Sequence, residues 1–387
     1  MYFVGIDISK YKHDCFITTE TGTVISENLS FENNKSGFQK LLNLLNSLDN
    51  EQKIRIGFEA TGHYHLNLML FLEKNNFSFM EFNAALVHKF ISTTTLRRTK
   101  TDKKDAISIT KYLMSVDYKP HPKQFYHKYA LKSLTRRREA LVHQRSYYKV
   151  ALTNILDVIF PEFKPFFDHS FSSTALFILS KYTSARKIAS MKDYDSIRRN
   201  SRGKFVYARF LKLKELAKNT IGVDNEIFTF QLSSTLTLLS NMDEQISLTE
   251  DKIAQIIKEL NPRCLSLKGI GIVSCASIVA EFGDFNRFKS ADACLAFAGL
   301  EPSTIQSGQA SHKGKMVKRG SSHLRASLMN AAGYVFMHEP VFTTYYYKKR
   351  SEGKPHRVAI SHLAKKLVRV IYTLETKDIP FDSSKLR

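Results

Sequence analysis

Apolar and polar residues alternate through much of the first sixty positions of the chain. YFVGIDIS alternates and is rich in residues that favour strands, and DCFITTETGTVISENLSF repeats this texture around a central Thr-Gly turn. These two stretches predict three antiparallel strands joined as a meander. SGFQKLLNLLNSL has apolar residues at helical spacing after a serine, and KIRIGFEA is typical of a buried strand.

The next segments complete a first domain. HYHLNLMLFLEKNN predicts a helix, FSFMEFNA predicts a fifth strand, and a helical stretch containing RRTKTDKKDA follows. The resulting order is strand-strand-strand-helix-strand-helix-strand. It predicts an α/β fold in residues 1–127, with a mixed sheet covered by helices, as in the ribonuclease-H-like fold.

Helical periodicity dominates from about residue 125. LKSLTRRREALVHQRSYYKVALTNIL predicts a long helix with a basic face, and the two prolines of FPEFKPFF interrupt it. SIRRNSRGKF predicts a loop, whereas TLTLLSNMDEQISLTEDKIAQIIKEL has heptad-like helical spacing. We expect residues 128–258 to form a helical, partly coiled-coil region that is structural or dimerising, with an Arg-rich face able to follow phosphates.

The remaining residues, 259–387, predict a mainly helical C-terminal domain. CLSLKGIGIVSCASIVAEFGDF indicates a helix, a Gly-Ile-Gly turn and a second helix, which resembles a helix-hairpin-helix element. Gly269 and Gly271 have no Cβ, so backbone N–H groups there could approach a phosphate closely. A plain helical hairpin with a glycine turn is the alternative. YYYKKRSEGKPHRVAISHLAKKLVRVIYTL predicts a basic linker and a basic amphipathic helix.

Residues 302–324 contain many Gly, Ser and Lys residues and little apolar periodicity, which predicts a flexible or ligand-organised loop. Ser307 precedes Gly308, and a serine beside a glycine can be presented for nucleophilic attack. A bystander serine in a basic loop is the alternative. Cations that could stabilise a phosphate under attack are Lys313, Lys315, Lys318, Arg319 and Arg325.

Composition narrows the function. The 387 residues include 58 Lys plus Arg against 36 Asp plus Glu, a net charge of +22, which favours nucleic acid or an anionic membrane as partner. No apolar run approaches the roughly 18 residues of a membrane span, and the opening MYFVGIDISK does not read as a signal peptide. We therefore expect a cytoplasmic protein that binds nucleic acid. Its four cysteines form no C-x-x-C pair and predict reduced, mostly buried thiols.

Carboxylates within the first domain suggest metal chemistry. Asp7 lies inside an apolar strand and Glu59 ends another, while the helical spacing of Asp102 and Asp105 puts them on one face. Two-metal phosphoryl transfer requires converging carboxylates, which Mg²⁺ prefers as ligands. We predict a magnesium site from these four residues, with the nucleic-acid backbone held by Lys100, Lys103 and Lys104. There are structural alternatives: Asp7 could belong to a strand-end turn and Glu59 could be a surface carboxylate. Asp102 and Asp105 could instead cap a helix.

Six motifs together resemble the insertion-sequence one-ten family of DEDD transposases over nearly the whole chain: GIDISK, FEATGHY, KTDKKDA, KGIGIVSCASIVAEFGDFNRF, AGLEPSTIQSG and KRGSSHLRASL. The resemblance implies a RuvC-like N-terminal domain, a coiled-coil region and a C-terminal transposase domain. It implies that Asp7, Glu59, Asp102 and Asp105 bind Mg²⁺, with two ions per site and Mn²⁺ able to substitute. It also implies that Ser307 is the catalytic serine.

The same resemblance implies a recombinase that joins an element to target DNA through a phosphoserine link, guided by a noncoding bridge RNA. It further implies a homo-oligomer, a dimer or tetramer, in the prokaryotic cytoplasm at the nucleoid. Gln309 stands where many relatives have glycine, so Ser303 and Ser311 remain alternative nucleophiles. Two other functions stay open: a RuvC-like nuclease of the Holliday-junction-resolvase type that uses water, and a non-catalytic nucleic-acid-binding protein.

Overall fold

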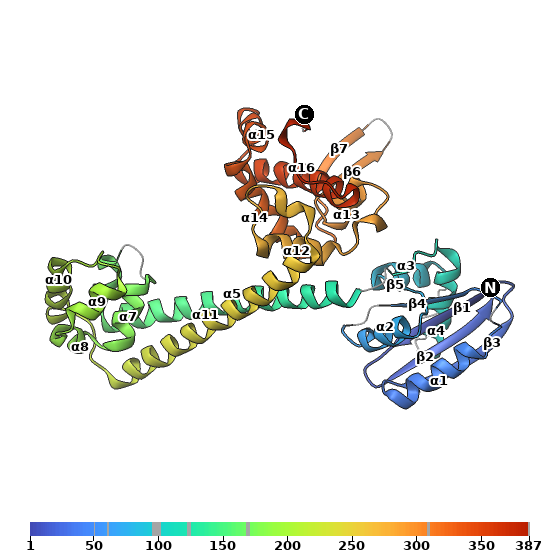
Figure 1. Ribbon diagram of the computed structural model, residues 1–387, viewed down its shortest axis with the longest axis horizontal. Helices are drawn as coiled ribbons and strands as arrows, with labels where there is room; N and C mark the ends of the chain where they lie inside the picture. Colours follow the sequence, from blue (N-terminus) through green and yellow to red (C-terminus); the bar gives the residue numbers. More distant parts are fainter. Residues whose placement is uncertain are drawn as a thin grey trace. The chain divides into compact units, whose positions relative to one another are not determined.

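A computed structural model of the protein describes residues 1–49, 51–59, 62–94, 102–121, 125–167, 171–307 and 310–385. Within its helices and strands, the description does not extend to the side chains of residues 85, 94, 102, 125–128, 302–307 and 310–315. The chain forms two units, Met1–Lys128 and Tyr129–Arg387, which are described separately below (Figure 1).

A five-stranded mixed sheet forms the centre of the first unit (Figure 1). The strand order is β3-β2-β1-β4-β5; β1 to β3 pair antiparallel, whereas β4 is parallel to both β1 and β5. The strands are β1 Tyr2–Ile8, β2 Lys12–Thr19, β3 Val24–Glu32, β4 Ile54–Glu59 and β5 Phe79–Phe82. The predicted α/β class is therefore confirmed, and the sheet is consistent with a ribonuclease-H-like domain.

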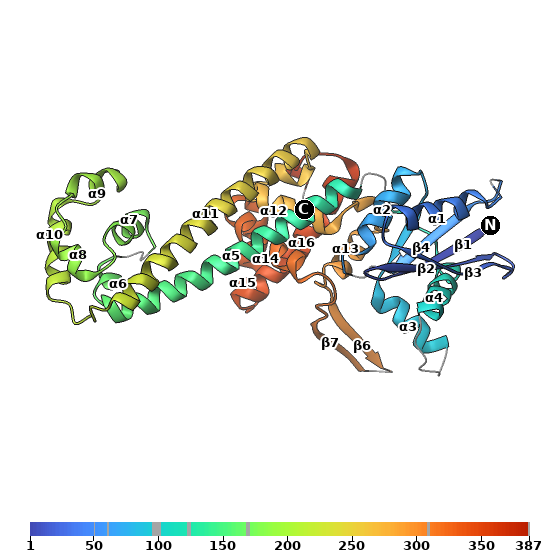
Figure 2. The same cartoon turned by 90° about the horizontal axis from the view of Figure 1, so that it is seen from below.

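Helices cover both faces of this sheet, with α1 and α2 on one side and α3 and α4 on the other (Figure 2). Phe38 of α1 contacts Phe71 of α2, while Phe3 of the sheet packs with Val87 of α3 and Leu113 of α4. Both faces of β1 and β2 are consequently buried, which stabilises strands rich in Ile, Val and Phe. The helices are α1 Lys35–Asn46, α2 His65–Lys74, α3 Ala84–Thr94 and α4 Asp102–Ser115.

Two long helices form a hairpin at the start of the second unit, with α5 Phe125–Ile159 and α11 Glu226–Leu260 side by side (Figures 1 and 2). Ion pairs join them, from Arg138 to Glu250 at 2.7 Å and from Arg145 to Asp243 at 2.8 Å. The predicted long helices are confirmed. Asn225 begins α11 because its side chain accepts a bond from the backbone N–H of Ile227.

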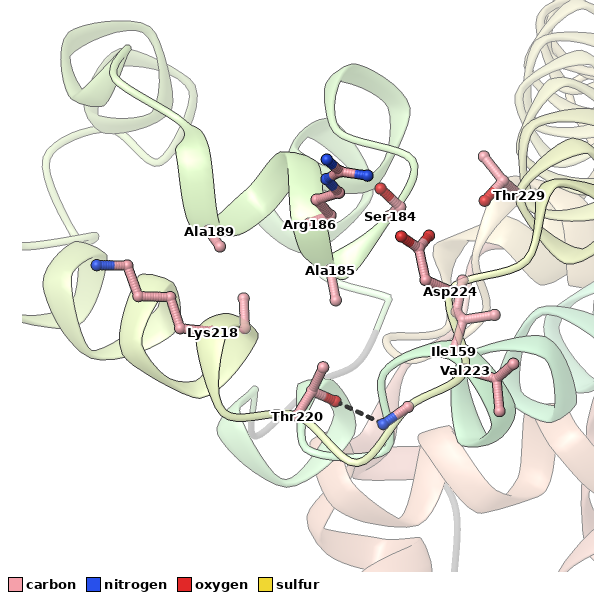
Figure 3. A pocket seen from close by; sticks show the side chains of 12 residues that line it. Ile159, Ser184, Ala185, Arg186, Ala189, Lys218, Thr220, Val223, Asp224 and Thr229 are labelled. Carbon is pink, nitrogen blue, oxygen red and sulfur yellow. Dashed lines mark hydrogen bonds between the residues drawn. The ribbon is translucent and has the colours of Figure 1, made fainter.

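Between these helices the chain folds into a small helical body, residues 160–225, which we call the knob. Its core includes the buried side chains of Phe163, Ile178, Ile197 and Leu213. A cavity of about 360 Å³ opens between α8, the end of α10 and the start of α11 (Figure 3). The knob helices are α6 Phe163–Phe166, α7 Ser173–Lys181, α8 Ala185–Ser190, α9 Tyr194–Asn200 and α10 Tyr207–Lys218.

The loop predicted over residues 196–205 is wrong in its first half, because residues 196–200 belong to α9. Asp193 explains the difference, since its side chain accepts a hydrogen bond from the backbone N–H of Ser196 and begins the helix early.

The C-terminal part of the second unit is mainly helical around one large core that includes Phe282, Leu328, Phe342 and Leu367. Arg136 of α5 donates to the buried carboxylate of Glu281 at 2.7 Å, which fixes this part to the long hairpin. Its elements are η1 Arg263–Ser266, α12 Ile272–Phe282, η2 Phe285–Arg287, α13 Ala291–Phe297, β6 Pro302–Ser307, β7 Ala310–Met316, α14 Ser322–His338, α15 Pro340–Ser351, α16 His356–Lys377 and η3 Ser383–Lys385.

Two local predictions in this part are wrong. The first helix of the predicted hairpin motif is only the 3-10 turn η1, because Asn261 and Pro262 end α11 immediately before it. The predicted loop at residues 302–324 contains the antiparallel pair β6 and β7. Backbone pairing can form a two-stranded ribbon without an apolar face, so hydrophobic periodicity did not reveal it.

The predicted buried cysteines are confirmed, because all four are free thiols without contact to solvent. Cys264 and Cys275 lie 3.2 Å apart between their Sγ atoms, and burial raises the pKa of the Cys15 and Cys294 thiols to about 12. Among the described helices, none combines the length and apolar character required to span a bilayer.

Candidate active site

Two of the predicted carboxylates lie at the ends of neighbouring parallel strands. Gly5 of β1 pairs with Gly57 of β4, and the register continues to the last paired residues before Asp7 and Glu59. Because side chains alternate along a strand, Asp7 and Glu59 face the same side of the sheet as the two glycines. Both carboxylate residues are half-buried. Parallel pairing thus puts them side by side at one edge of the sheet.

Helix α4 lies directly on this face. A Cβ at Gly5 would lie 2.1 Å from Thr110 Oγ1 and 2.8 Å from the carbonyl oxygen of Ala106, and a Cβ at Gly57 would lie 3.1 Å from Leu113. Only glycine permits such a close approach, so the two glycines allow α4 to contact the strand backbones. This contact determines how far α4 stands from the strand ends.

The first turn of α4 lies toward the carboxylate end of β1. Phe3 packs with Ile109 and Leu113, whereas Gly5 lies against Ala106, so α4 runs antiparallel to β1. Two strand residues advance about 6.7 Å and one helical turn about 5.4 Å. An advance of two residues along β1 leads from Gly5 to Asp7. An advance of one turn back along α4 leads from Ala106 toward the turn that contains Asp102 and Asp105.

These positions do not form a preassembled metal cage in the described residues. Within that part of the chain, His, Cys, Asp and Glu side chains form no group of three or more able to hold an ion. Asp105 is half-buried, and Asp102 begins α4 but its side chain lies outside the description. The four-carboxylate site therefore stays a prediction.

A fifth carboxylate, not singled out from the sequence, lies next to Asp7. Asp14 of β2 is directly opposite Asp7 in the antiparallel register and is only 4% exposed. Lys12 approaches it, with 3.5 Å between Nζ and Oδ2. Opposed residues of an antiparallel pair share a face, so Asp14 also faces α4. Alternation along β2 is a signal that could have indicated this face, but only the register with β1 brings the two aspartates together.

Two predicted backbone-binding lysines lie on α4. Lys103 and Lys104 are exposed, and Lys103 donates to Glu27 Oε2 at 3.0 Å; Lys100 falls outside the described residues. A groove of about 580 Å³ lies beside the helix and is lined by apolar side chains, by two lysines and by Glu27. Its lining residues include Phe16, Val24, Met114, Lys103 and Lys111.

In the second unit, the predicted serine ends β6. Ser307 pairs with Ala310 in the β6–β7 register, and Gln306 pairs with Ser311. Ser303 also lies in β6, and Lys313 and Lys315 lie in β7. These side chains are outside the description, so the structure gives only their order along the ribbon.

The remaining predicted phosphate contacts fall into two groups, three cations that follow the ribbon in sequence and two glycines that precede α12. Lys318 and Arg319 are exposed, whereas Arg325 is half-buried and donates to the Lys318 carbonyl at 3.3 Å. Gly269 has φ of +96°, and its missing Cβ allows the backbone of Val335 to approach; a Cβ would lie 2.7 Å from Val335 Cα. Packing therefore accounts for Gly269. Gly271 is exposed at the N-terminus of α12, with open space beside it.

Comparison with known proteins identifies the family. Residues 4–161 match the model of the DEDD transposases, and residues 261–347 match the model described as Transposase IS116/IS110/IS902 family. The chain belongs to the IS110 family of transposases. The enzyme is therefore a transposase that acts on DNA, and its DEDD class implies use of a divalent metal ion.

Two similar proteins match this transposase over nearly its whole length, and a third matches a shorter part. A pilin gene-inverting protein of Moraxella lacunata is 24% identical over 98% of this chain and 97% of that protein. An uncharacterized protein of insertion element IS116 from Streptomyces clavuligerus is 23% identical over 96% of this chain and 94% of its own length. An uncharacterized protein of insertion element IS110 from Streptomyces coelicolor is 28% identical over 38% of this chain and 36% of that protein.

Proposed function

We propose that this transposase cuts and rejoins DNA by magnesium-dependent phosphoryl transfer through a serine–DNA intermediate. The observation that carries the proposal is the shared edge where β1 and β4 end beneath the first turn of α4. Asp7 and Glu59 belong to those strand ends, and Asp102 and Asp105 belong to that turn.

The donor chemistry of this edge fits a hard divalent cation. Mg²⁺ binds a few carboxylate oxygens together with water and substrate phosphates, and all four proposed ligands are carboxylates. When bound, the cation would neutralise charge on the phosphate under attack and on the leaving oxygen; two ions, or Mn²⁺, would serve the same purpose. Lys103 and Lys104 are exposed on the same helix and would hold the adjoining backbone.

Ser307 is proposed as the nucleophile. Its Oγ would form a bond to a DNA phosphorus while the bond from that phosphorus to a sugar oxygen breaks, and the serine proton would pass to the departing sugar hydroxyl. A hydroxyl of the partner strand would then attack the phosphoserine and return the proton to Oγ. Each step exchanges one phosphoester for another, so no external energy source is required.

We further propose a noncoding bridge RNA as guide and a homo-oligomer, a dimer or tetramer, as the active species; both rest on the motif resemblance to the family. Base pairing by the RNA would then select the DNA. Purification of the protein from cells that carry the whole element tests the guide: we expect a discrete element-encoded RNA in the complex and no strand transfer after ribonuclease treatment.

The nucleophile is tested by trapping protein–DNA adducts on denaturing gels with end-labelled substrate. Ser307→Ala should abolish adducts while leaving DNA binding unchanged, and Ser303→Ala and Ser311→Ala are matched controls that should retain them. Loss of adducts in a control variant alone would transfer the assignment to that serine. Adduct-free cleavage by Ser307→Ala in Mg²⁺ would instead favour a RuvC-like nuclease that uses water.

A further inference from the structure

Four cations stand within seven residues at the end of α9 in the knob. Residues 198–204, which we call the basic turn, have the sequence RRNSRGK and include no acidic residue. The cations are Arg198, Arg199, Arg202 and Lys204, and all four are exposed. In the described part of the chain, none of their side chains forms an ion pair, although Asp195 lies one helical turn before Arg198 and Arg199.

Other cations of the knob have structural partners. Lys181 pairs with Asp193, Lys214 donates to the Met191 carbonyl at 2.8 Å, and Arg209 donates to the Phe166 carbonyl at 3.0 Å. Residues 160–225 contain 13 Lys plus Arg and 6 Asp plus Glu, so the basic turn adds charge to a body that is already positive. Mutual repulsion makes such a cluster costly unless an anion accompanies it.

The basic turn is held rigidly by its own hydrogen bonds. The backbone N–H of Gly203 donates to the Arg198 carbonyl at 2.9 Å, and the Ser201 hydroxyl donates to the same carbonyl at 2.8 Å. Ser201 Oγ also accepts from the backbone N–H of Phe205 at 3.0 Å. Ile197 and Phe205 anchor the two ends in the knob core.

Arg202 and Gly203 complete the turn with φ of +53° and +79°. A backbone fixed in this way lowers the backbone share of the ordering cost on binding.

A purely structural role accounts for only part of this arrangement. Arg198 and Arg199 occupy the last turn of α9, where cations complement the helix dipole by about 0.3–1 kcal/mol. Arg202 and Lys204 follow the helix end, and their side chains extend from a turn that backbone bonds already stabilise. The helix needs no more than one or two of the four charges.

We propose that the basic turn binds the phosphate backbone of duplex DNA. Arginine donates two hydrogen bonds in a geometry that matches phosphate, and four cations on a fixed backbone can reach neighbouring phosphates. The segment lies between the two family matches, which cover residues 4–161 and 261–347, so it is separate in sequence from the carboxylates and the serine ribbon. The knob thus provides a second, sequence-independent DNA contact outside the catalytic machinery.

The test measures binding of the full-length protein to a mixed-sequence duplex of about 30 base pairs by fluorescence anisotropy, from about 50 to 200 mM salt. The variant combines Arg198→Gln, Arg199→Gln, Arg202→Gln and Lys204→Gln. We expect the slope of log affinity against log salt to become shallower by about 3.6, which is about 0.9 for each of four lost phosphate contacts. Affinity should fall at least about 10-fold at the lower salt.

Two matched variants separate this contact from net charge and from folding. The first is a control that loses the same charge elsewhere, and its salt slope should stay steeper than that of the basic-turn variant. It carries Gln at four exposed lysines of the first unit, Lys35, Lys40, Lys53 and Lys74. A second variant with lysine at the three arginines of the basic turn should retain most of the salt dependence.

Several results would overturn the proposal. They are equal slopes for the basic-turn variant and the wild type, equal losses in the lysine control, or a loss confined to a single-stranded or structured RNA probe. A lowered melting temperature with unchanged DNA affinity would reduce the basic turn to helix stabilisation.

Discussion

Asp14 lies directly opposite Asp7 on neighbouring antiparallel strands, and both face helix α4. Like charges in opposed positions destabilise a sheet, and Asp14 is almost fully buried. Lys12 lies 3.5 Å from Asp14, and its half-exposed side chain offsets part of this repulsion. A divalent cation at the strand ends would stabilise both carboxylates, so we predict that Asp14 is a positioning residue for the proposed metal site.

Asp14→Asn should therefore weaken cation binding without abolishing chemistry. We expect the Mg²⁺ concentration for half-maximal strand transfer to rise about 10-fold, because one unit of charge is lost beside Asp7. Mn²⁺ titration of the DNA-free protein by electron paramagnetic resonance should show the same weakening. Asp7→Asn is the reference and should remove activity at saturating Mg²⁺. If Asp14→Asn leaves both metal measurements unchanged while Asp7→Asn abolishes them, Asp14 is only structural.

Close contact between α4 and β1 should be sensitive to one methyl group. Gly5→Ala would put Cβ 2.1 Å from Thr110 Oγ1 and force the helix away from the strand, which should destabilise the first unit by about 1–3 kcal/mol. The rate of strand transfer should fall by more than the loss of folded protein explains, because Asp102 and Asp105 move with the helix.

Gly333→Ala provides a matched control for this substitution. Gly333 lies in α14 with open space around its Cβ position, so the change should be neutral or stabilising by about 0.5–1 kcal/mol. Thermal melts and strand-transfer rates would check both variants. If Gly5→Ala and Gly333→Ala had the same melting temperature and the same strand-transfer rate, the position of α4 would not depend on Gly5.

Removal of divalent metal should separate chemistry from the DNA contact proposed at the knob. A chelator is expected to stop strand transfer completely, since the carboxylates alone repel the phosphate. Duplex binding should persist, because Arg198, Arg199 and Arg202 need no metal to contact phosphate. Added Mg²⁺ or Mn²⁺ should restore activity. Strand transfer that survives chelation would contradict a metal-dependent mechanism.

Much of the fold could be predicted from local pattern. The five strands and the long helices have strong periodicity or strand-forming composition, and both are local properties. Asp14 was missed because its importance depends on register: Ile8 pairs with His13 across the four residues that separate them, and this pairing brings Asp14 opposite Asp7. Register between strands is a tertiary property that alternation within one strand does not determine.

One other failure has a local physical cause. The β6–β7 ribbon has several polar and few apolar residues, so periodicity indicated a loop where backbone pairing forms strands. The phosphate contact at Gly269 stays a prediction, and the approach of the Val335 backbone is a second reason for glycine at this position. Glycine in a basic sequence signals close approach of something, and only the packed structure distinguishes a neighbouring helix from a ligand.

The ion pair between α5 and α12 should make the second unit sensitive to acid. Burial raises the pKa of Glu281, but the hydrogen bond from Arg136 and the charges of Lys132 and Arg136 outweigh it, so the pKa lies below the usual value. A lowered pKa in the folded state means that this stabilisation is complete above the unfolded pKa of about 4.5 and is lost as pH falls through the folded value.

Glu281→Gln should thus destabilise the unit by about 2–3 kcal/mol at neutral pH, because two cations lose a carboxylate that is 4% exposed. The partial exposure of Arg136 limits the loss. Melting curves of both proteins at neutral pH and below pH 4 would measure it, and the difference should shrink in acid. Glu250→Gln, at the pair with Arg138 whose carboxylate is more exposed than that of Glu281, is the control and should cost less than about 1 kcal/mol. A difference for Glu281→Gln that does not change with pH would show that shape, rather than the ionised pair, holds α12 to α5.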